Sequence, residues 1–280
     1  MERTKEANDF IVAKQRVLEH LRDTKASNKN ISDWFLIAIN GSWNYDLETP
    51  ESDIDTKLLV VPSWKDLIQS KQKNYLHIQE NGEHTEVKDF RSYFKTMMKQ
   101  NINFVETLYA KIVFVNPKYQ EEWDMIQEIR DAISFCNPRA SVNCMVGMMI
   151  QKSIDMYNIT PGREWSISKY GYDLKSFHHM MRLFFFLEDF VNLKSYEKCL
   201  RPDISYCRQY LKDIKTGDVI YTLDQLKELT DEIISNAKYL RKTFLEEIEP
   251  YQEAFDLQQE LIYDILDAVI ESIIKKSLGE

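Results

Sequence analysis

The spacing of hydrophobic and polar residues changes near residue 118 of this 280-residue chain. Before that point, short apolar runs separated by turn residues predict strands or extended segments at 34–39, 53–61, 75–80, 83–90 and 111–115. Helical spacing predicts helices before and between them, at 8–23, 64–71 and 91–99. After residue 118 only helical spacing remains, and it is clearest at 174–191, 224–242 and 253–276. The pattern predicts an α+β chain whose strands all lie in 1–118 and whose remainder, 119–280, is helical.

The first two predicted strands enclose a polar segment. Gly41-Ser42 follows the first strand, and Asp53 and Asp55 open the second. Because side chains on a strand alternate faces, the two aspartates are expected to point to the same side. Converging carboxylates repel each other unless a cation lies between them, and oxygen ligands next to phosphate favour magnesium. A Gly-Ser turn after a strand offers N–H groups and a hydroxyl to a phosphate. These parts predict a metal–nucleotide site.

Gly41-Ser42, ten residues, and then Asp53-x-Asp55 resemble the signature of the DNA polymerase β-like nucleotidyltransferase superfamily. The resemblance implies a nucleotidyltransferase domain over 1–118, with a mixed sheet and flanking helices, and an all-helical domain over 119–280. It implies transfer of a nucleoside monophosphate from a nucleoside triphosphate, with ATP expected, to an acceptor hydroxyl with release of pyrophosphate. Asp53 and Asp55 would be catalytic and hold two Mg²⁺ ions, with Mn²⁺ as the alternative, while Gly41 and Ser42 would bind the triphosphate.

Members of this superfamily usually carry a third carboxylate on a neighbouring strand, as metal ligand and as base toward the attacking hydroxyl. Asn81-Gly82 predicts a hairpin turn, and the strand after it places Val87 toward the core and Glu86 with Lys88 toward the site. Glu86 is therefore the candidate for the third catalytic, metal-binding carboxylate. Asp89 is the alternative, but it stands where the next helix should begin and suits an N-cap.

Five further polar residues have two interpretations each. Lys57 shares a strand face with the aspartates, so it is expected to bind nucleotide or neutralise them, whereas a lysine extending from a sheet edge is the alternative. Asn44 and Tyr45 either border the nucleotide or belong to an ordinary loop. Asn101 and Glu106 either shape the rim of the site or serve as a cap and a helix-surface residue.

The helix expected at 174–191 has a polar side and an apolar side. At 100° per residue, its polar side carries Lys175, His178, His179, Arg182 and Asp189. Lys175, His178 and Arg182 are expected to bind the nucleotide phosphates across a cleft, and a solvated helix face is the alternative. Lys-x-x-His-x-x-x-Arg after Gly171-Tyr172-Asp173 also resembles the helical half of a poorly characterised bacterial and phage branch of the superfamily. The two adjacent histidines diverge by about 100° and are not expected to share an ion.

The charge and composition of the chain limit the kinds of partner that it is expected to bind. The formal charge of −9 argues against a grip on nucleic acid along the whole chain. Four cysteines without metal-ligand spacing, a charged N-terminus and no apolar run long enough for a membrane span predict a cytoplasmic protein that binds no membrane. The acceptor stays open between an RNA end, a protein and a small molecule. A catalytically impaired nucleotide-binding regulator or toxin–antitoxin component is the competing function.

Overall fold

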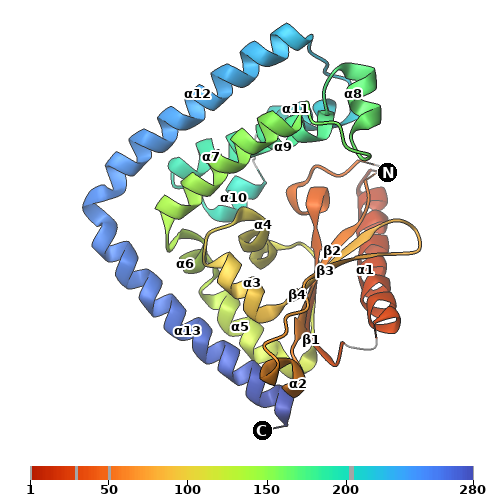
Figure 1. Ribbon diagram of the computed structural model, residues 1–280, viewed down its shortest axis with the longest axis vertical. Coiled ribbons are helices and arrows are strands. Elements are labelled where there is room, and N and C mark those ends of the chain that lie inside the picture. The colour runs from red at the N-terminus through yellow and green to blue at the C-terminus, as the bar shows by residue number, and fades with distance from the viewer. Residues whose placement is uncertain (1, 29–30, 50–51, 202–204, 280) are drawn as a thin grey trace.

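A mixed five-stranded sheet forms the N-terminal part of the protein, which is shown in Figure 1 as a computed structural model. The structure describes residues 2–28, 31–49, 52–201 and 205–279. In spatial order the strands are β3 (Tyr75–Ile78), β4 (His84–Asp89), β2 (Asp55–Val61), β1 (Asp33–Asn40) and β5 (Val113–Val115). β2 and β4 run parallel, and the other neighbouring strands run antiparallel.

β1 and β2 are covered on both faces of the sheet. The side chains of 35–39 and 56–61 are all buried, which explains why these strands read as continuous apolar runs and not as an alternating pattern. Helix α1 (Glu2–Ser27) covers one face, to which it contributes Ala13, Val17 and Leu21. The helical remainder of the molecule lies on the other side of the sheet (Figure 1).

The other regular elements of the described chain are helices. Between the strands lie η1 (Gly41–Tyr45), α2 (Trp64–Ile68), α3 (Phe90–Met97), α4 (Ile102–Val105) and η2 (Glu106–Tyr109). After β5 come η3 (Pro117–Tyr119), α5 (Gln120–Glu128), α6 (Arg130–Phe135), α7 (Pro138–Asp155), α8 (Glu164–Tyr170), α9 (Leu174–Val191), α10 (Tyr196–Leu200), α11 (Ser205–Thr216), α12 (Leu223–Ile248), η4 (Glu249–Tyr251) and α13 (Gln252–Leu278). The long helices α12 and α13 meet at an angle along the outer edge of the molecule (Figure 1).

Side-chain caps fix where several helices begin. Asp173 accepts a hydrogen bond from the Ser176 N–H at 2.9 Å and so starts α9. Thr222 and Gln225 form a reciprocal capping box at the start of α12. Each cap satisfies N–H groups that have no partner within the helix, and so it fixes the residue at which the helix begins.

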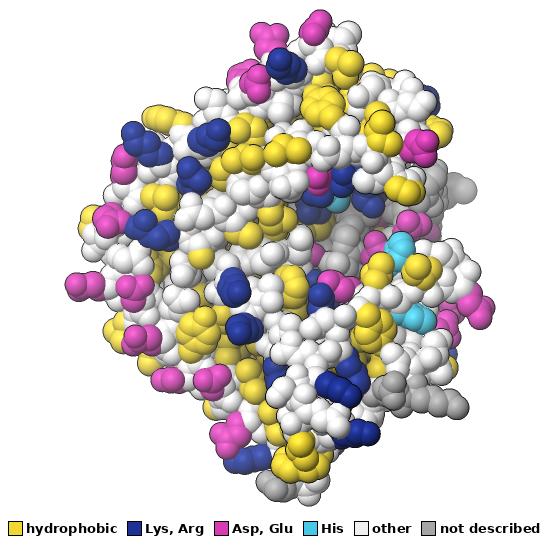
Figure 2. Space-filling model, viewed as in Figure 1, with side chains coloured by type: hydrophobic (Ala, Val, Ile, Leu, Met, Phe, Trp, Pro, Cys, Tyr) yellow, Lys and Arg dark blue, Asp and Glu magenta, His cyan; other side chains and the backbone are white. Residues whose placement is uncertain are grey.

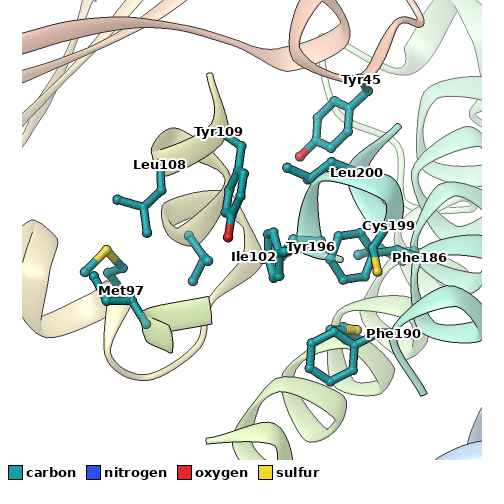
Figure 3. Close-up of a cluster of buried hydrophobic side chains, with 14 of the residues drawn as sticks. Tyr45, Met97, Ile102, Leu108, Tyr109, Phe186, Phe190, Tyr196, Cys199 and Leu200 are labelled. Carbon is teal, nitrogen blue, oxygen red and sulfur yellow. The ribbon is translucent and has the colours of Figure 1, made fainter. Parts of the chain in front are cut away.

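One hydrophobic core continues from the sheet into the helical half. Its buried members come from both halves, for example Phe35 of β1, Tyr93 of α3, Phe186 of α9 and Ile273 of α13. Figure 3 shows part of the junction, where Tyr109 of η2 lies near Tyr196 of α10. Their ring centroids are 5.1 Å apart. The strands end before residue 118, as expected, but the core is continuous across the predicted domain boundary.

The α+β class, with a mixed sheet, flanking helices and a long helical C-terminal part, is confirmed. The expected hairpin is also present, with Gly82 at φ 88°. The strand at 53–61 was predicted too long: it begins at Asp55, because β1 ends at Asn40, which pairs with Asp55 and leaves no ladder partner for Asp53. Among the described helices, none combines the length and the apolar character that crossing a membrane requires.

Candidate functional site

A cavity of about 380 Å³ lies between the start of β2 and the helices α9 and α11. Seven of the residues expected at the site line it: Gly41, Ser42, Asp53, Asp55, Lys175, His178 and Arg182. Ser52, His179 and Lys215 complete the lining. In Figure 2, basic and histidine side chains with acidic ones beside them lie in a hollow between the helical part and the strands. The structure thus brings together residues from positions 41 to 215.

The acidic wall of the cavity is formed by the turn after β1 and the start of β2. Gly41 has φ 71°, a backbone conformation that favours glycine, and a Cβ there would lie 3.8 Å from Asp55 Oδ2. Asp55 Oδ1 is buried without a hydrogen-bond partner, although His84 Nδ1 lies 3.4 Å away. Asp53 precedes the strand and is exposed. The two carboxylates therefore reach the cavity from a turn segment and a strand end, not from one regular strand.

The opposite wall is the polar side of α9. Lys175, His178 and Arg182 follow each other at helical spacing and all line the cavity. Burial, followed by the charges of Arg182, Lys215 and Lys175, lowers the pKa of His178 to about 3. His178 is therefore neutral near pH 7, so it offers a hydrogen bond and no positive charge. Its Nε2 is buried without a hydrogen-bond partner, which leaves this atom for a ligand.

Arg182 packs on an aromatic ring, and its charge acts on a buried acid. Its guanidinium carbon lies 3.7 Å from the centroid of the Tyr45 ring. Burial raises the pKa of Glu106 to about 7, although the charge of Arg182 lowers it. Glu106 is only 2% exposed, so the helix-surface interpretation of this residue was wrong. Glu106 lies inside the protein because η2 packs into the core next to α10.

Lys215 of α11 is a cationic residue of the cavity that was not among the expected site residues. Its Nζ donates to Ser52 Oγ at 2.7 Å and to the Leu47 carbonyl at 3.3 Å. Burial, followed by the neighbouring charge of Lys175, lowers its pKa. From the sequence this position was assigned to a helix end and turn, which also resembles the superfamily, but no site role was expected because the distance to the cavity depends on how α11 packs.

Lys57 and Glu86 were expected at the site, but neither is among the residues that line the cavity. They are register partners on β2 and β4, with Lys57 Nζ 3.6 Å from Glu86 Oε2. Lys57 is 1% exposed and also donates to the Asn103 carbonyl. Its ammonium group is thus paired with Glu86 and not with the aspartates. Because β2 is an inner strand of the sheet, the interpretation of Lys57 as a lysine extending from a sheet edge was wrong.

Other expected polar residues have structural partners. Asp89 caps α3, accepting from the Arg91 N–H at 3.1 Å, as its N-cap interpretation predicted. Asn101 caps α4 in the same way. Asn44 is buried, and its carbonyl oxygen accepts from Arg201 Nε at 2.9 Å. Asn44 therefore connects η1 to the helical half and does not border the cavity.

The carboxylates fit a magnesium ion that is held largely by a nucleotide. In the part of the chain that the structure describes, no three His, Cys, Asp or Glu side chains are grouped closely enough to hold a metal ion. Mg²⁺ keeps several waters and commonly binds through one or two carboxylates together with substrate phosphates. Asp53, and Asp55 with its unpartnered Oδ1, supply that number of ligands.

Comparisons with known proteins give weak structural likeness and no match in sequence. No protein-family model matches the chain, and no curated protein matches it. A solved structure described as a nucleotidyltransferase-like protein from Exiguobacterium sibiricum 255-15 is 11% identical, with a TM-score of 0.33. The match covers 93% of this chain and 91% of that one. At this similarity the likeness carries no argument about activity, which therefore depends on the residues of the cavity.

Proposed function

We propose that this protein is a magnesium-dependent nucleotidyltransferase. It moves a nucleoside monophosphate from a nucleoside triphosphate, with ATP as the expected donor, to an acceptor hydroxyl and releases pyrophosphate. The observation that supports this most is one cavity with two carboxylates and a Gly-Ser turn on one wall and Lys175, Arg182 and Lys215 on the other. Carboxylates for a metal ion and cationic side chains for phosphates in one cavity are what a metal–triphosphate complex requires, and this supports the proposal.

Each wall has a distinct task in the proposed reaction. Asp53 and Asp55 would hold Mg²⁺, which when bound stabilises the charge on the attacking and leaving oxygens. The Gly41-Ser42 turn would donate backbone N–H and hydroxyl hydrogen bonds to the triphosphate. Lys175 and Arg182 would stabilise the charge that develops on the departing pyrophosphate.

His178 and Lys215 have different roles in this scheme. His178 is neutral, so its Nε2, when it carries the ring proton, would donate one hydrogen bond to a phosphate oxygen and contribute no net charge. Lys215 bonds Ser52, the residue before Asp53, and thereby joins α11 to the acidic wall. Closure of the cavity around a nucleotide would therefore depend on contacts between the sheet and the helical half.

The test is transfer of label from each α-labelled nucleoside triphosphate in the presence of Mg²⁺ and a cell extract. We expect one triphosphate to label an RNA, a protein or a small molecule, and we expect chelation of Mg²⁺ to stop the labelling. Absence of labelling with all four triphosphates, together with absence of pyrophosphate release, would contradict the proposal. The identity of the labelled product would give the class of acceptor.

A nucleotide-binding regulator or toxin–antitoxin component is the second candidate. The position of Glu86 favours it, because the expected third carboxylate is paired with Lys57 and Lys88 at 3.6 and 3.1 Å and does not line the cavity. His84 lies beside Asp55 instead. Product formation separates the two functions: a regulator would bind the nucleotide, keep its affinity in Glu86→Ala, and give no product in the wild type.

A further inference from the structure

The backbone between the two aspartates is bound by a carboxylate from another part of the chain. The Ile54 N–H donates to Glu83 Oε1 at 3.1 Å. Ile54 lies outside β2, so its N–H has no partner in the ladder of the sheet. Glu83, from the turn of the β3–β4 hairpin, supplies that partner. One hydrogen bond therefore restrains the Asp53–Ile54 peptide, which lies between the two aspartate side chains.

Glu83 itself is held in place by several donors. Its Oε2 accepts from Asn81 Nδ2 at 2.6 Å and lies 2.9 Å from His20 Nε2, with Arg16 Nε at 3.5 Å. Burial opposes the charge of Glu83, but the hydrogen bonds from Asn81, His20 and Ile54 lower its pKa overall. The carboxylate is thus ionised at neutral pH and restrained from more than one side.

His20 connects this carboxylate to the strand that carries Asp55. The ring is 1% exposed, and its Nδ1 lies 3.0 Å from Thr56 Oγ1. Thr56 follows Asp55 on β2, with its side chain on the opposite face, where its hydroxyl lies 2.9 Å from Thr85 Oγ1 of β4. Both ring nitrogens of His20 are therefore used, one toward the hairpin and one toward the strand.

We propose that Glu83, held by His20, is a positioning residue for the two aspartates. By fixing the Ile54 peptide it directs Asp53 and Asp55 into the cavity, and so it sets the affinity of the site for a metal–nucleotide complex. This inference rests on the proposed function for the identity of that ligand. Residues that orient metal ligands typically change metal affinity by about 10- to 100-fold when they are replaced.

The test compares Glu83→Ala, Glu83→Gln and the wild type. Amide hydrogen exchange of Ile54 is measured without nucleotide, and Mn²⁺ binding is measured by electron paramagnetic resonance with a non-hydrolysable ATP analogue. Glu83→Ala should speed Ile54 exchange about 10-fold or more and weaken Mn²⁺ binding about 10- to 100-fold. Glu83→Gln keeps an oxygen for the Ile54 N–H, so it should restore most of the protection of Ile54 from exchange and most of the Mn²⁺ affinity. The matched control is Glu80→Gln, which removes an exposed charge from the same hairpin and should change neither.

Wild-type Ile54 exchange or wild-type Mn²⁺ affinity in Glu83→Ala would overturn the inference. If Glu83→Ala does not fold, His20→Phe decides in its place, since it keeps a ring and removes both ring hydrogen bonds. Weaker Mn²⁺ binding in His20→Phe would support the inference, and unchanged binding would overturn it. Neither Ile54 exchange nor Mn²⁺ binding requires turnover. A wild-type protein that releases no pyrophosphate would therefore refute the proposed activity and leave this inference untouched.

Discussion

Replacing Glu106 by glutamine should stabilise this protein at alkaline pH. Burial raises the pKa of Glu106 from 4.5 to about 7, and the charge of Arg182 only partly opposes this. That difference corresponds to roughly 3 kcal/mol by which the folded state favours the protonated carboxyl. Because the folded pKa is raised, the stabilising contribution is fully present below pH 4.5 and is lost as the pH rises through about 7. Glutamine has no proton to lose, so the variant keeps the contribution.

The measurement is urea unfolding of wild type and Glu106→Gln at pH 4.5, 6 and 8. We expect the free energies of unfolding to agree at pH 4.5 and the variant to be more stable by roughly 3 kcal/mol at pH 8. Glu247→Gln, an exposed glutamate of α12, is the control and should show no such trend. A Glu106→Gln variant that is less stable than wild type at pH 8 would refute the reasoning, because Glu106 would then be stabilising as a carboxylate.

Three further substitutions have expected outcomes. Lys57→Met should raise the free energy of unfolding at pH 7 by about 1–3 kcal/mol, because burial lowers the pKa of Lys57 to about 8 and Glu86 keeps Lys88 as a partner. The advantage of the variant should shrink as the pH rises from 8 to 10.5. In this range Lys57 is already deprotonated in the folded wild type but still protonated in the unfolded chain, so the wild type becomes more stable. Arg201→Ala should destabilise the protein by about 2–4 kcal/mol in urea unfolding, since it removes donors to Asn44 at 2.9 and 3.1 Å. Lys215→Ala should weaken nucleotide binding about tenfold in calorimetric titration, because a partly buried charge leaves the cavity wall.

Each of these has a result that speaks against it. If Lys57→Met were less stable than wild type, and by the same amount at pH 7 and pH 10, the ion pair of Lys57 with Glu86 would outweigh the cost of burying the charge. An Arg201→Ala variant as stable as wild type would mean that Asn44 has alternative donors. If Lys215→Ala bound nucleotide normally while Lys175→Ala did not, the α9 side of the cavity alone would hold the phosphates. The control for both binding variants is Lys227→Ala, an exposed lysine of α12.

Much of the fold could be predicted from the sequence because it depends on local periodicity. The apolar runs of β1 and β2, the Asn81-Gly82 hairpin and the two-sided helix α9 each follow from side-chain direction in a regular element. The ends of elements were less predictable. Asp53 lies outside β2 because a strand can extend only as far as its partner, and the length of β1 was set by Gly41 at positive φ.

The composition of the cavity was predictable only where two elements each presented a clear motif. The turn with its aspartates and the α9 residues fulfilled that condition, whereas Lys215 did not, because its distance to Ser52 depends on the packing of α11. Lys57 was expected beside the aspartates, but its pairing with Glu86 depends on the register of parallel strands. The neutral state of His178 depends on burial, which periodicity does not report.

The most direct test of the central claim is pyrophosphate release from nucleoside triphosphates with Mg²⁺, measured for wild type and for Asp53→Ala combined with Asp55→Ala. We expect release in the wild type, none above background in the double variant, and an unchanged unfolding transition in both, since Asp53 is exposed and Asp55 is partly so. Release that survives in the folded double variant would contradict it, because the two carboxylates that define the acidic wall would then be dispensable.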